Sequence, residues 1–356
     1  MNLLKTWLFI CTFLLAFQGQ SQSVQIIDST LISNPTGSCI SCISFRGMSV
    51  PNNKVVWISG SKGSVARSTN GGKSFELIKI PGYESFDFRS IYAFNDKKAI
   101  VVNSGSPAYI LKTFDGGNTW RKVYEDLRQE IFLDAIDFWD SEKGMVLGDP
   151  IEERFMLIKT SDGGNTWYEM DTSMRPWAIP GESVFAASGT SFRCMTSNSL
   201  AFVTGGSKSV FHWLEIDKKY QRHELKTMVQ GKASEGAFSF DYNAKYIAVV
   251  GGDYASDTTK IKQALYRYAY DKDGLQLLNM KTFYTYYKSC VALLEKGNLV
   301  SCGTLGVAVN HTEQTTTLPG QKTYISTKSF NVVRKARKGN LTVLAGPKGT
   351  IGVFQP

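Results

Sequence analysis

An eight-residue sequence that recurs at a nearly constant interval is the feature that most constrains the fold of this chain. Its copies are STNGGKSF at 68–75, TFDGGNTW at 113–120 and TSDGGNTW at 160–167. The closing aromatic residues Phe75, Trp120 and Trp167 are 45 and 47 residues apart. A period of this length predicts a repeat architecture, in which each unit buries its apolar surface only against its neighbours.

Each copy has the residue types of a tight turn. Its Asp or Asn side chain can accept hydrogen bonds from backbone N–H groups ahead of it, and its glycines can adopt positive φ. The closing aromatic ring then fixes the turn to an apolar surface. No Gly-x-Gly-x-x-Gly or Gly-Lys-Ser/Thr sequence leads from a predicted strand into a predicted helix, which argues against a phosphate-binding loop. The residues predicted to build the turns are Asn70, Gly72, Phe75, Asp115, Gly117, Trp120, Asp162, Gly164 and Trp167.

The three copies resemble the Asp-box, Ser/Thr-x-Asp-x-Gly-x-Thr-Trp, of the BNR-repeat β-propellers. The first copy has Asn in place of Asp and Phe in place of Trp. The resemblance implies an all-β ring of blades. It also implies that each box lies on the outer turn between the third and fourth strands of a blade, away from the ligand-binding face.

Seven similar units can be traced outwards from the boxes, so we predict a seven-bladed β-propeller, with six or eight blades as alternatives. Three units carry a box and begin near Phe45, Phe88 and Leu133, and four others begin near residues 191, 237, 289 and 331. The seventh unit has only three strands, while the alternating segment 24–31 has no blade of its own. We therefore expect the N-terminal and C-terminal strands to pair and close the ring, giving one domain over residues 24–356.

Residues 1–22 have the pattern of a secretory signal peptide. Lys5 precedes an apolar run at 7–17, which is followed by a small polar segment at 18–23. The apolar run is too short to span a membrane, and no later stretch reaches that length. We expect an exported protein, periplasmic or extracellular, with no integral membrane segment after cleavage.

The formal net charge is +9, and the basic residues are dispersed apart from one cluster at 334–338. Dispersed charge is typical of a solvated surface. For an exported protein, the expected partner is another protein, an acidic peptide, a glycan or a membrane face, and not nucleic acid. We expect a monomer.

We place the candidate binding site at one mouth of the central channel, on the face opposite the boxes. The first strand of each blade should begin at this face, where guanidinium groups can pair with a carboxylate or an acidic peptide. Alternatively, these groups pair only with one another and with water in a wet channel. The candidates are Arg46, Arg89, Asp134 and Arg193 from the strand starts, and Asp149 and Asp253 from the turns between second and third strands.

A glycoside hydrolase is the alternative function, because Asp-boxes also occur in sialidases. Such an enzyme would use Asp134, Tyr284 and Glu182, or a carboxylate pair of Asp134 with Asp149 or Glu182. Sialidases need three arginines for the substrate carboxylate, yet blades five to seven have no arginine where the first strand begins. We therefore predict no catalytic residues in this chain.

Cys39 and Cys42 form a C-x-x-C sequence just before the first blade. We expect a local structural disulfide or simple burial; redox chemistry is the alternative, but the βαβ context of thioredoxin-like proteins is missing. Cys290 and Cys302 would face each other in a regular hairpin and could form a second bridge. The histidines are scattered, so we predict no metal site and no cofactor.

Within the Asp-box propellers, the chain resembles the photosystem II stability/assembly factor family. The resemblance rests on a first strand with Phe-Arg, a short second strand ending in Gly and the box, found at 88–120 and 133–167 and more loosely at 45–75. It implies a non-catalytic propeller that holds partner proteins during membrane-complex assembly, with Arg46, Arg89 and Arg193 as its arginine patch. Some bacterial relatives carry an oxidoreductase label, which is a second alternative, although no nucleotide or flavin motif is present here. Photosystem partners do not transfer, because nothing in the sequence indicates a photosynthetic host.

Overall fold

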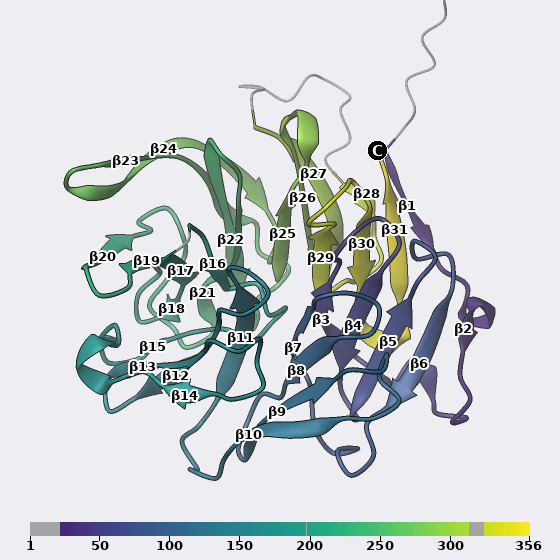
Figure 1. The fold of residues 1–356 in the computed structure, drawn as a ribbon. Helices are drawn as coiled ribbons and strands as arrows, with labels where there is room; N and C mark the ends of the chain where they lie inside the picture. Colours follow the sequence, from purple (N-terminus) through teal and green to yellow (C-terminus); the bar gives the residue numbers. More distant parts are fainter. Residues whose placement is uncertain (1–21, 197, 313–323) are drawn as a thin grey trace, which may run out of the picture.

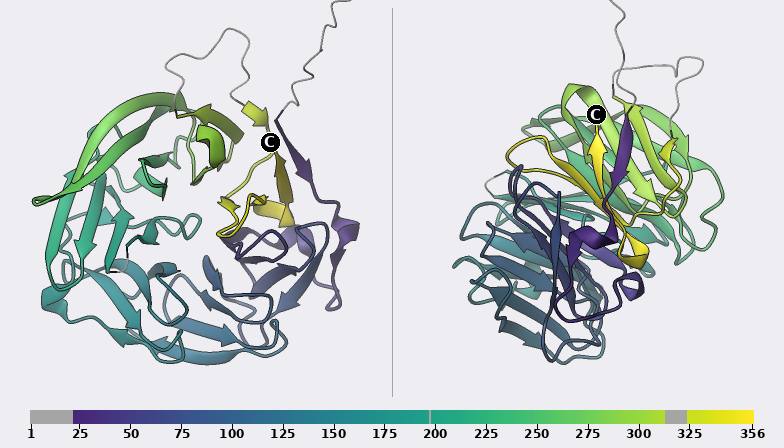
Figure 2. Two further views of the ribbon diagram at one scale, coloured as in Figure 1. Left: turned by 45° about the horizontal axis from the view of Figure 1, so that its top comes forward. Right: turned by 90° about the vertical axis from the view of Figure 1, so that its right-hand side faces the viewer.

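The computed structural model describes residues 22–196, 198–312 and 324–356, which form seven sheets (Figure 1). Figure 2 shows these sheets arranged as the blades of a ring. The predicted seven-bladed β-propeller is confirmed. Residues 1–21, which make up nearly all of the predicted signal peptide, lie outside the described part of the chain.

Each blade has four strands, and the first strand lines the channel. In blades one to three the strands are β3 (Phe45–Ser49), β4 (Val56–Gly60), β5 (Ser64–Ser68) and β6 (Phe75–Lys79); β7 (Ser90–Ala93), β8 (Ala99–Val102), β9 (Ala108–Thr113) and β10 (Arg121–Asp126); β11 (Leu133–Phe138), β12 (Gly144–Ile151), β13 (Arg154–Thr160) and β14 (Tyr168–Glu169).

The blades without a box follow the same order. Their strands are β16 (Phe192–Cys194), β17 (Ser199–Val203), β19 (Val210–Glu215) and β20 (Lys219–Glu224); β21 (Glu235–Tyr242), β22 (Tyr246–Asp253), β23 (Ile261–Asp271) and β24 (Gly274–Thr285); β25 (Cys290–Leu293), β26 (Asn298–Gly303), β27 (Gly306–His311) and β28 (Tyr324–Ser326); β29 (Val332–Lys335), β30 (Thr342–Ala345), β31 (Ile351–Gln355) and β1 (Ser23–Ile26).

A few short elements decorate this ring. β2 (Ile32–Ser33) pairs in parallel with β6, and β15 (Glu182–Ser183) and β18 (Gly205–Gly206) extend the sheet of blade five. The helical elements of the described residues are single 3₁₀ turns, η1 (Ser29–Leu31), η2 (Ile40–Cys42), η3 (Thr172–Met174), η4 (Glu295–Gly297) and η5 (Pro347–Gly349). Within this part of the chain, no helix has the length and apolarity needed to cross a membrane.

The ring closes through the two ends of the chain, as the sequence predicts. β1 pairs antiparallel with β31, with Val24 opposite Phe354 and Ile26 opposite Gly352 (Figure 1). The strand is shorter than the alternating segment suggests, because η1 follows from Ser29. This pairing covers the outer edge of β31, which would otherwise present free backbone donors and acceptors.

The box turns connect the third strand to the fourth in blades one to three, and each is held by its own side chains. In the second copy, Asp115 accepts hydrogen bonds from the backbone N–H of Thr119 at 2.9 Å and from its hydroxyl at 2.6 Å. These two bonds lower the pKa of Asp115 to about 2. The backbone N–H of Gly117 donates to the Thr113 hydroxyl at 2.9 Å.

The second glycine of each box also packs against the preceding blade. A Cβ on Gly164 would lie 2.3 Å from Ile100 Cδ1 of β8, and one on Gly117 would lie 2.8 Å from Ile78 Cδ1 of β6. The closing ring of the second copy reinforces this contact, since Trp120 lies edge-on to Trp57 of blade one at 6.5 Å. Trp167 instead lies edge-on to Phe138 of its own blade at 5.9 Å. The boxes therefore join neighbouring blades as well as turning the chain.

The cysteines adopt two different states. Cys39 and Cys42 form a disulfide, which is one of the two states expected for them. Cys290 and Cys302 are opposite each other in the β25–β26 pair, as expected for a regular hairpin, but both are buried free thiols. The suggested second bridge is therefore absent from the described residues, and Cys194 is free as well.

We expect Gly164→Ala to destabilise the propeller by more than Gly82→Ala. Both glycines have a φ near +80°, but Gly82 has no atom within 4 Å of the added Cβ, so it reports the backbone cost alone. The additional cost at Gly164 should be about 1–3 kcal/mol, because the methyl group has to displace the packed Ile100. Denaturant unfolding of both variants measures the difference, and equal losses would contradict the packing role of the box.

Candidate functional site: the two mouths of the channel

A buried segment crosses the central channel. Residues 186–191, which lie between the end of β15 and the start of β16, are buried throughout. We call this segment the plug. It separates a mouth on the face of the boxes, the box-side mouth, from a mouth on the other face, the opposite mouth.

The plug is held by groups from several blades. Ser188 donates to the carbonyl of Ser289 at 2.8 Å, and the Thr190 hydroxyl donates to the Ser239 hydroxyl at 2.6 Å. Arg334 Nη2 donates to the carbonyl of Gly189 at 3.1 Å. At Gly189 a Cβ would lie 2.7 Å from Ser90 Oγ, so the backbone approaches β7 closely and a side chain would be strained. Because the Ser188 and Thr190 hydroxyls and the Gly189 carbonyl are paired inside the channel, the plug is a fixed part of the core.

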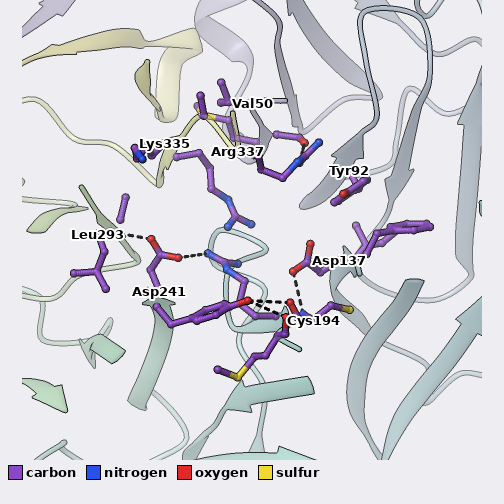
Figure 3. Close-up of a pocket in the computed structure, with 18 of the residues that line it drawn as sticks. Val50, Tyr92, Asp137, Cys194, Asp241, Leu293, Lys335 and Arg337 are labelled. Carbon is purple, nitrogen blue, oxygen red and sulfur yellow. Dashed lines mark hydrogen bonds and ion pairs between the residues drawn. The ribbon is translucent and has the colours of Figure 1, made fainter. Parts of the chain in front are cut away.

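The box-side mouth is a cavity of about 500 Å³ at the far ends of the first strands (Figure 3). Four basic and two acidic side chains line it, together with Tyr92 and Trp139. The charged residues are Arg193, Arg334, Lys335 and Arg337, with Asp137 and Asp241. Basic groups are therefore in excess.

The arginines of the box-side mouth are incompletely paired. Arg193 is 3.6 Å from Asp241, whose other oxygen accepts from the backbone N–H of Leu293. Arg334 has no hydrogen-bond partner for its Nε among the described residues. Burial, followed by the positive charge of Arg193, lowers the pKa of Arg334 to about 10. The group remains cationic at neutral pH and would gain from an incoming anion.

Arg337 is the exposed arginine of this mouth and bridges the first two blades. It donates to the Ser49 hydroxyl at 2.9 Å and to the carbonyl of Ala93, and its guanidinium lies 4.3 Å from the centre of the Tyr92 ring. Tyr92, Trp139 and Arg337 also line a second cavity of about 780 Å³, which we call the outer groove. The outer groove runs over the box face and adds Lys98, Lys112, Lys338, Phe94 and Phe114, with Asp140 and Asp162 as its acidic residues.

The opposite mouth, where the sequence places the binding site, is a separate cavity of about 500 Å³. The structure brings Arg46, Arg89 and Asp149 together here. Arg46 donates to the carbonyl of Ala187 in the plug at 3.4 Å, and Arg89 Nε donates to Asp87 at 2.8 Å. Burial, followed by the nearby charge of Arg89, lowers the pKa of Arg46.

Arg193 does not belong to this mouth, so the expected grouping of three arginines is wrong. Arg46 lies in a bulge of β3, where the pairing shifts between Phe45 and Gly47. A bulge re-aims the side chain of its extra residue. Arg193 lies in β16, which pairs with β17 without a shift, and its Phe192 is opposite Phe202 and not at the end of the second strand. The Phe-Arg sequence of blade four is thus in a different register, further along the channel.

The two acidic candidates near Arg89 form a buried pair. Asp134 is fully buried in the bulge of β11, and neither of its carboxylate oxygens has a hydrogen-bond partner among the described residues. Burial, followed by the charge of Asp149, raises the pKa of Asp134, and burial raises the pKa of Asp149 to about 6. Asp149 also accepts from the backbone N–H of Val184 at 2.8 Å. Asp253 is at the edge of this face and ion-pairs with Lys232 at 3.7 Å.

The residues of the hydrolase alternative do not converge. Tyr284 is 61% exposed on β24, the outermost strand of blade five, whereas Asp134 is buried on the innermost strand of blade three. Glu182 is buried in a separate network, in which it accepts from His212, Thr204 and Arg222 at 2.7, 2.7 and 2.8 Å. Burial would raise the pKa of Glu182, but the bonds from His212 and Thr204 outweigh it and the pKa is lowered.

The segment at 175–182, which lies before blade four, is anchored by this network. His212 also hydrogen-bonds the Tyr220 hydroxyl at 2.7 Å, and Arg222 stacks on Trp177 at 4.1 Å. Every polar atom of the Glu182 carboxylate is therefore occupied, which is a structural role. In the described ranges, no group of three or more His, Cys, Asp or Glu side chains is arranged to hold a metal ion.

The sequence does contain a signal for Arg334 and Arg337, which were not among the predicted site residues. Arg334 and Arg337 belong to the basic cluster at 334–338, the only one in the chain. The sequence could not show that this cluster meets Arg193 across the channel, because that contact depends on the ring and on the register of β16.

We expect Asp134→Asn to stabilise the protein at high pH. A carboxyl whose pKa is higher in the folded than in the unfolded chain binds extra protons when folded, so stability falls as pH rises above about 4, the pKa of an Asp in the unfolded chain. Removing one charge of the pair should reduce this fall and raise the free energy of unfolding near pH 8 by about 1–3 kcal/mol. Urea unfolding at several pH values provides the measurement.

Asp115→Asn is the matched control. Because the pKa of Asp115 is lowered in the fold, its neutral replacement should lose stability at neutral pH. A pH profile of Asp134→Asn that parallels the unchanged protein would contradict the buried acid pair.

Comparison with known proteins agrees with this architecture. Residues 85–213, from just before blade two into the third strand of blade four, match the family model described as "Photosynthesis system II assembly factor YCF48". No curated protein matches the sequence. The expected resemblance to these assembly factors is confirmed.

Solved structures match over nearly the whole chain. A structure of YCF48 bound to a D1 peptide covers 94% of this chain and 100% of its own, with 13% identity and a TM-score of 0.61. YCF48 from Cyanidioschyzon merolae covers 94% and 99%, with 11% identity and a TM-score of 0.61. The WD40 domain of Neurospora crassa Pan2 covers 88% of each chain, with 14% identity and a TM-score of 0.55. At these identities, the likeness establishes the fold.

Proposed function

We propose that this chain, a seven-bladed propeller similar to the photosystem II assembly factors, is an exported, non-catalytic binding protein that holds an acidic segment of a partner protein at its box-side mouth. The observation that carries the proposal is the meeting of Arg193, Arg334 and Arg337 around one opening. They come from blade four and from the chain at and after β29 of blade seven. Guanidinium groups match carboxylates bidentately. Lys335 is paired with Glu295 at 3.1 Å, and the facing Asp137 and Asp241 are too few to neutralise the three arginines.

The outer groove gives the ligand a path away from the channel. It is continuous with the mouth through Tyr92, Trp139 and Arg337. Lys112 lies 4.6 Å from the centre of the Phe114 ring, which is 44% exposed, so a cationic and an aromatic group lie side by side in the groove. Such a surface suits an extended peptide with acidic and apolar side chains, and one of the similar solved structures is of YCF48 bound to a D1 peptide.

Two observations support export. Residues 1–22 have the composition of a signal peptide, and the Cys39–Cys42 disulfide suits an oxidising compartment. The partner would accordingly be an exported protein or the exposed part of a membrane protein.

A signal peptide at residues 1–22 is removed during export. Mass spectrometry of the protein recovered from the envelope or medium should find a mature N-terminus between residues 19 and 24. Recovery of the intact N-terminus from the cytoplasm would contradict export.

Arg337→Gln should weaken binding of an acidic peptide about 10-fold or more, because it removes a charged hydrogen-bond donor from the mouth. The probe is a fluorescein-labelled decapeptide of alternating Glu and Leu, measured by fluorescence anisotropy. Its affinity for the unchanged protein should fall as salt increases, since the exposed charges are screened.

Arg46→Gln, at the opposite mouth, is the matched control and should bind the probe like the unchanged protein. Arg193→Gln tests a second blade, with its folding checked by thermal unfolding. Equal affinity of the Arg337 and Arg46 variants, or equal binding of an alternating Lys and Leu decapeptide, would overturn the proposal.

A further inference from the structure

The opposite mouth has the size and shape of a small-molecule site. Its volume of about 500 Å³ lies within the range of about 300–1,000 Å³ that is typical of ligand pockets. The plug closes the inner end of this cavity, with Ala186 and Ala187 among the lining residues. The cavity is therefore a cup that opens on one face only.

One side of the cup is aromatic. Phe185 stacks on Phe238 with ring centres 3.9 Å apart and an angle of 9° between the planes. Tyr254 meets both rings edge-on, at 6.3 and 6.1 Å, and Tyr287 meets Phe238 edge-on at 5.1 Å. Tyr254 is 54% exposed, so it stands at the rim, while Phe238 and Tyr287 are buried. A flat aromatic ring could add to this arrangement through further edge-to-face contacts.

The other side of the cup is cationic. Arg46 has a single hydrogen bond among the described residues, the 3.4 Å contact with the carbonyl of Ala187, and no carboxylate within ion-pair distance. Its neighbour Arg89 is already paired with Asp87 at 2.8 Å. Arg46 is the cation of this cavity that most lacks an anion, and a half-buried guanidinium binds a carboxylate more strongly than an exposed one does.

A β-bulge positions both the cationic and the aromatic side chain of the cavity. Arg46 and Phe238 occupy the bulge positions of β3 and β21, where the pairing shifts between Phe45 and Gly47 and between Ala237 and Ser239. Bulges aim their extra residue away from the regular sheet face and are enriched beside binding sites. A cation and an aromatic ring are thereby directed into one cavity from two blades.

The acidic residues limit the charge of the ligand. Asp149 lines the cavity, and the fully buried Asp134 is adjacent to it. A second negative group on the ligand would be repelled by the Asp149 carboxylate, so the cavity favours one carboxylate.

We propose that the opposite mouth binds a small aromatic monocarboxylic acid, with its ring against Phe185 and Phe238 and its carboxylate on Arg46. This site is separate from the peptide-binding mouth, because the plug lies between them, and it goes beyond the function proposed above.

Phenylacetate is the probe, titrated into the purified protein by isothermal titration calorimetry. We expect saturable binding of one molecule per chain. Arg46→Gln should weaken it about 10-fold or more, because a charged hydrogen-bond donor is lost. Phenylacetamide, which keeps the ring and loses the charge, should bind the unchanged protein about 10-fold more weakly for the same reason.

Two further variants separate this site from the rest of the molecule. Phe238→Leu keeps an apolar side chain but removes the stacked aromatic ring, and should weaken the binding of phenylacetate by about 3-fold or more. Thermal unfolding of this variant checks that the propeller remains folded. Arg337→Gln, at the box-side mouth, should leave phenylacetate binding unchanged while it weakens the acidic decapeptide.

Absence of saturable binding at about 10 mM phenylacetate would overturn the inference, since that concentration detects even millimolar affinity. Equal affinity of the Arg46 variant and the unchanged protein would overturn it as well. Neither result affects the peptide proposal, which is tested separately by the decapeptide measurements.

Discussion

The structure depends on the pairing of β1 with β31. Each blade is a four-stranded sheet whose two faces are buried only against its neighbours, so an open ring would expose apolar surface on its end blades. Strands from opposite ends of the chain meet in blade seven, and the largest apolar cluster spans blades six, seven and one at this point. The closed ring holds the first strands of all seven blades around one channel.

The plug gives this channel two separate ends. An unobstructed channel would present one continuous wet surface, on which Arg46 and Arg334 would belong to the same site. Instead, each arginine donates to a carbonyl of the plug, Arg46 to Ala187 and Arg334 to Gly189. The protein can therefore carry different chemistry on its two faces, with an arginine cluster at the box-side mouth and an aromatic cup with Arg46 at the opposite mouth.

Strand register decides which residues reach which mouth. Arg46 and Arg193 both follow a phenylalanine in the first strand of a blade, and in the sequence the two positions look equivalent. The bulge of β3 turns Arg46 towards the opposite mouth, whereas the regular pairing of β16 places Arg193 beside Asp241 at the box-side mouth. A shift of a few residues in one strand thus moves a charge from one face of the ring to the other.

The sequence by itself determined the features that local chemistry controls. The box turns follow from their Asp, Gly and Thr residues, their spacing sets the blade period, and the unpaired alternating segment 24–31 implies the ring closure. The tertiary structure alone decided the functional surfaces. Arg193 and Arg337 are 144 residues apart in the chain, and whether they meet depends on bulges, on register and on the path of the plug. These are set by packing between blades, which leaves no local pattern in the sequence.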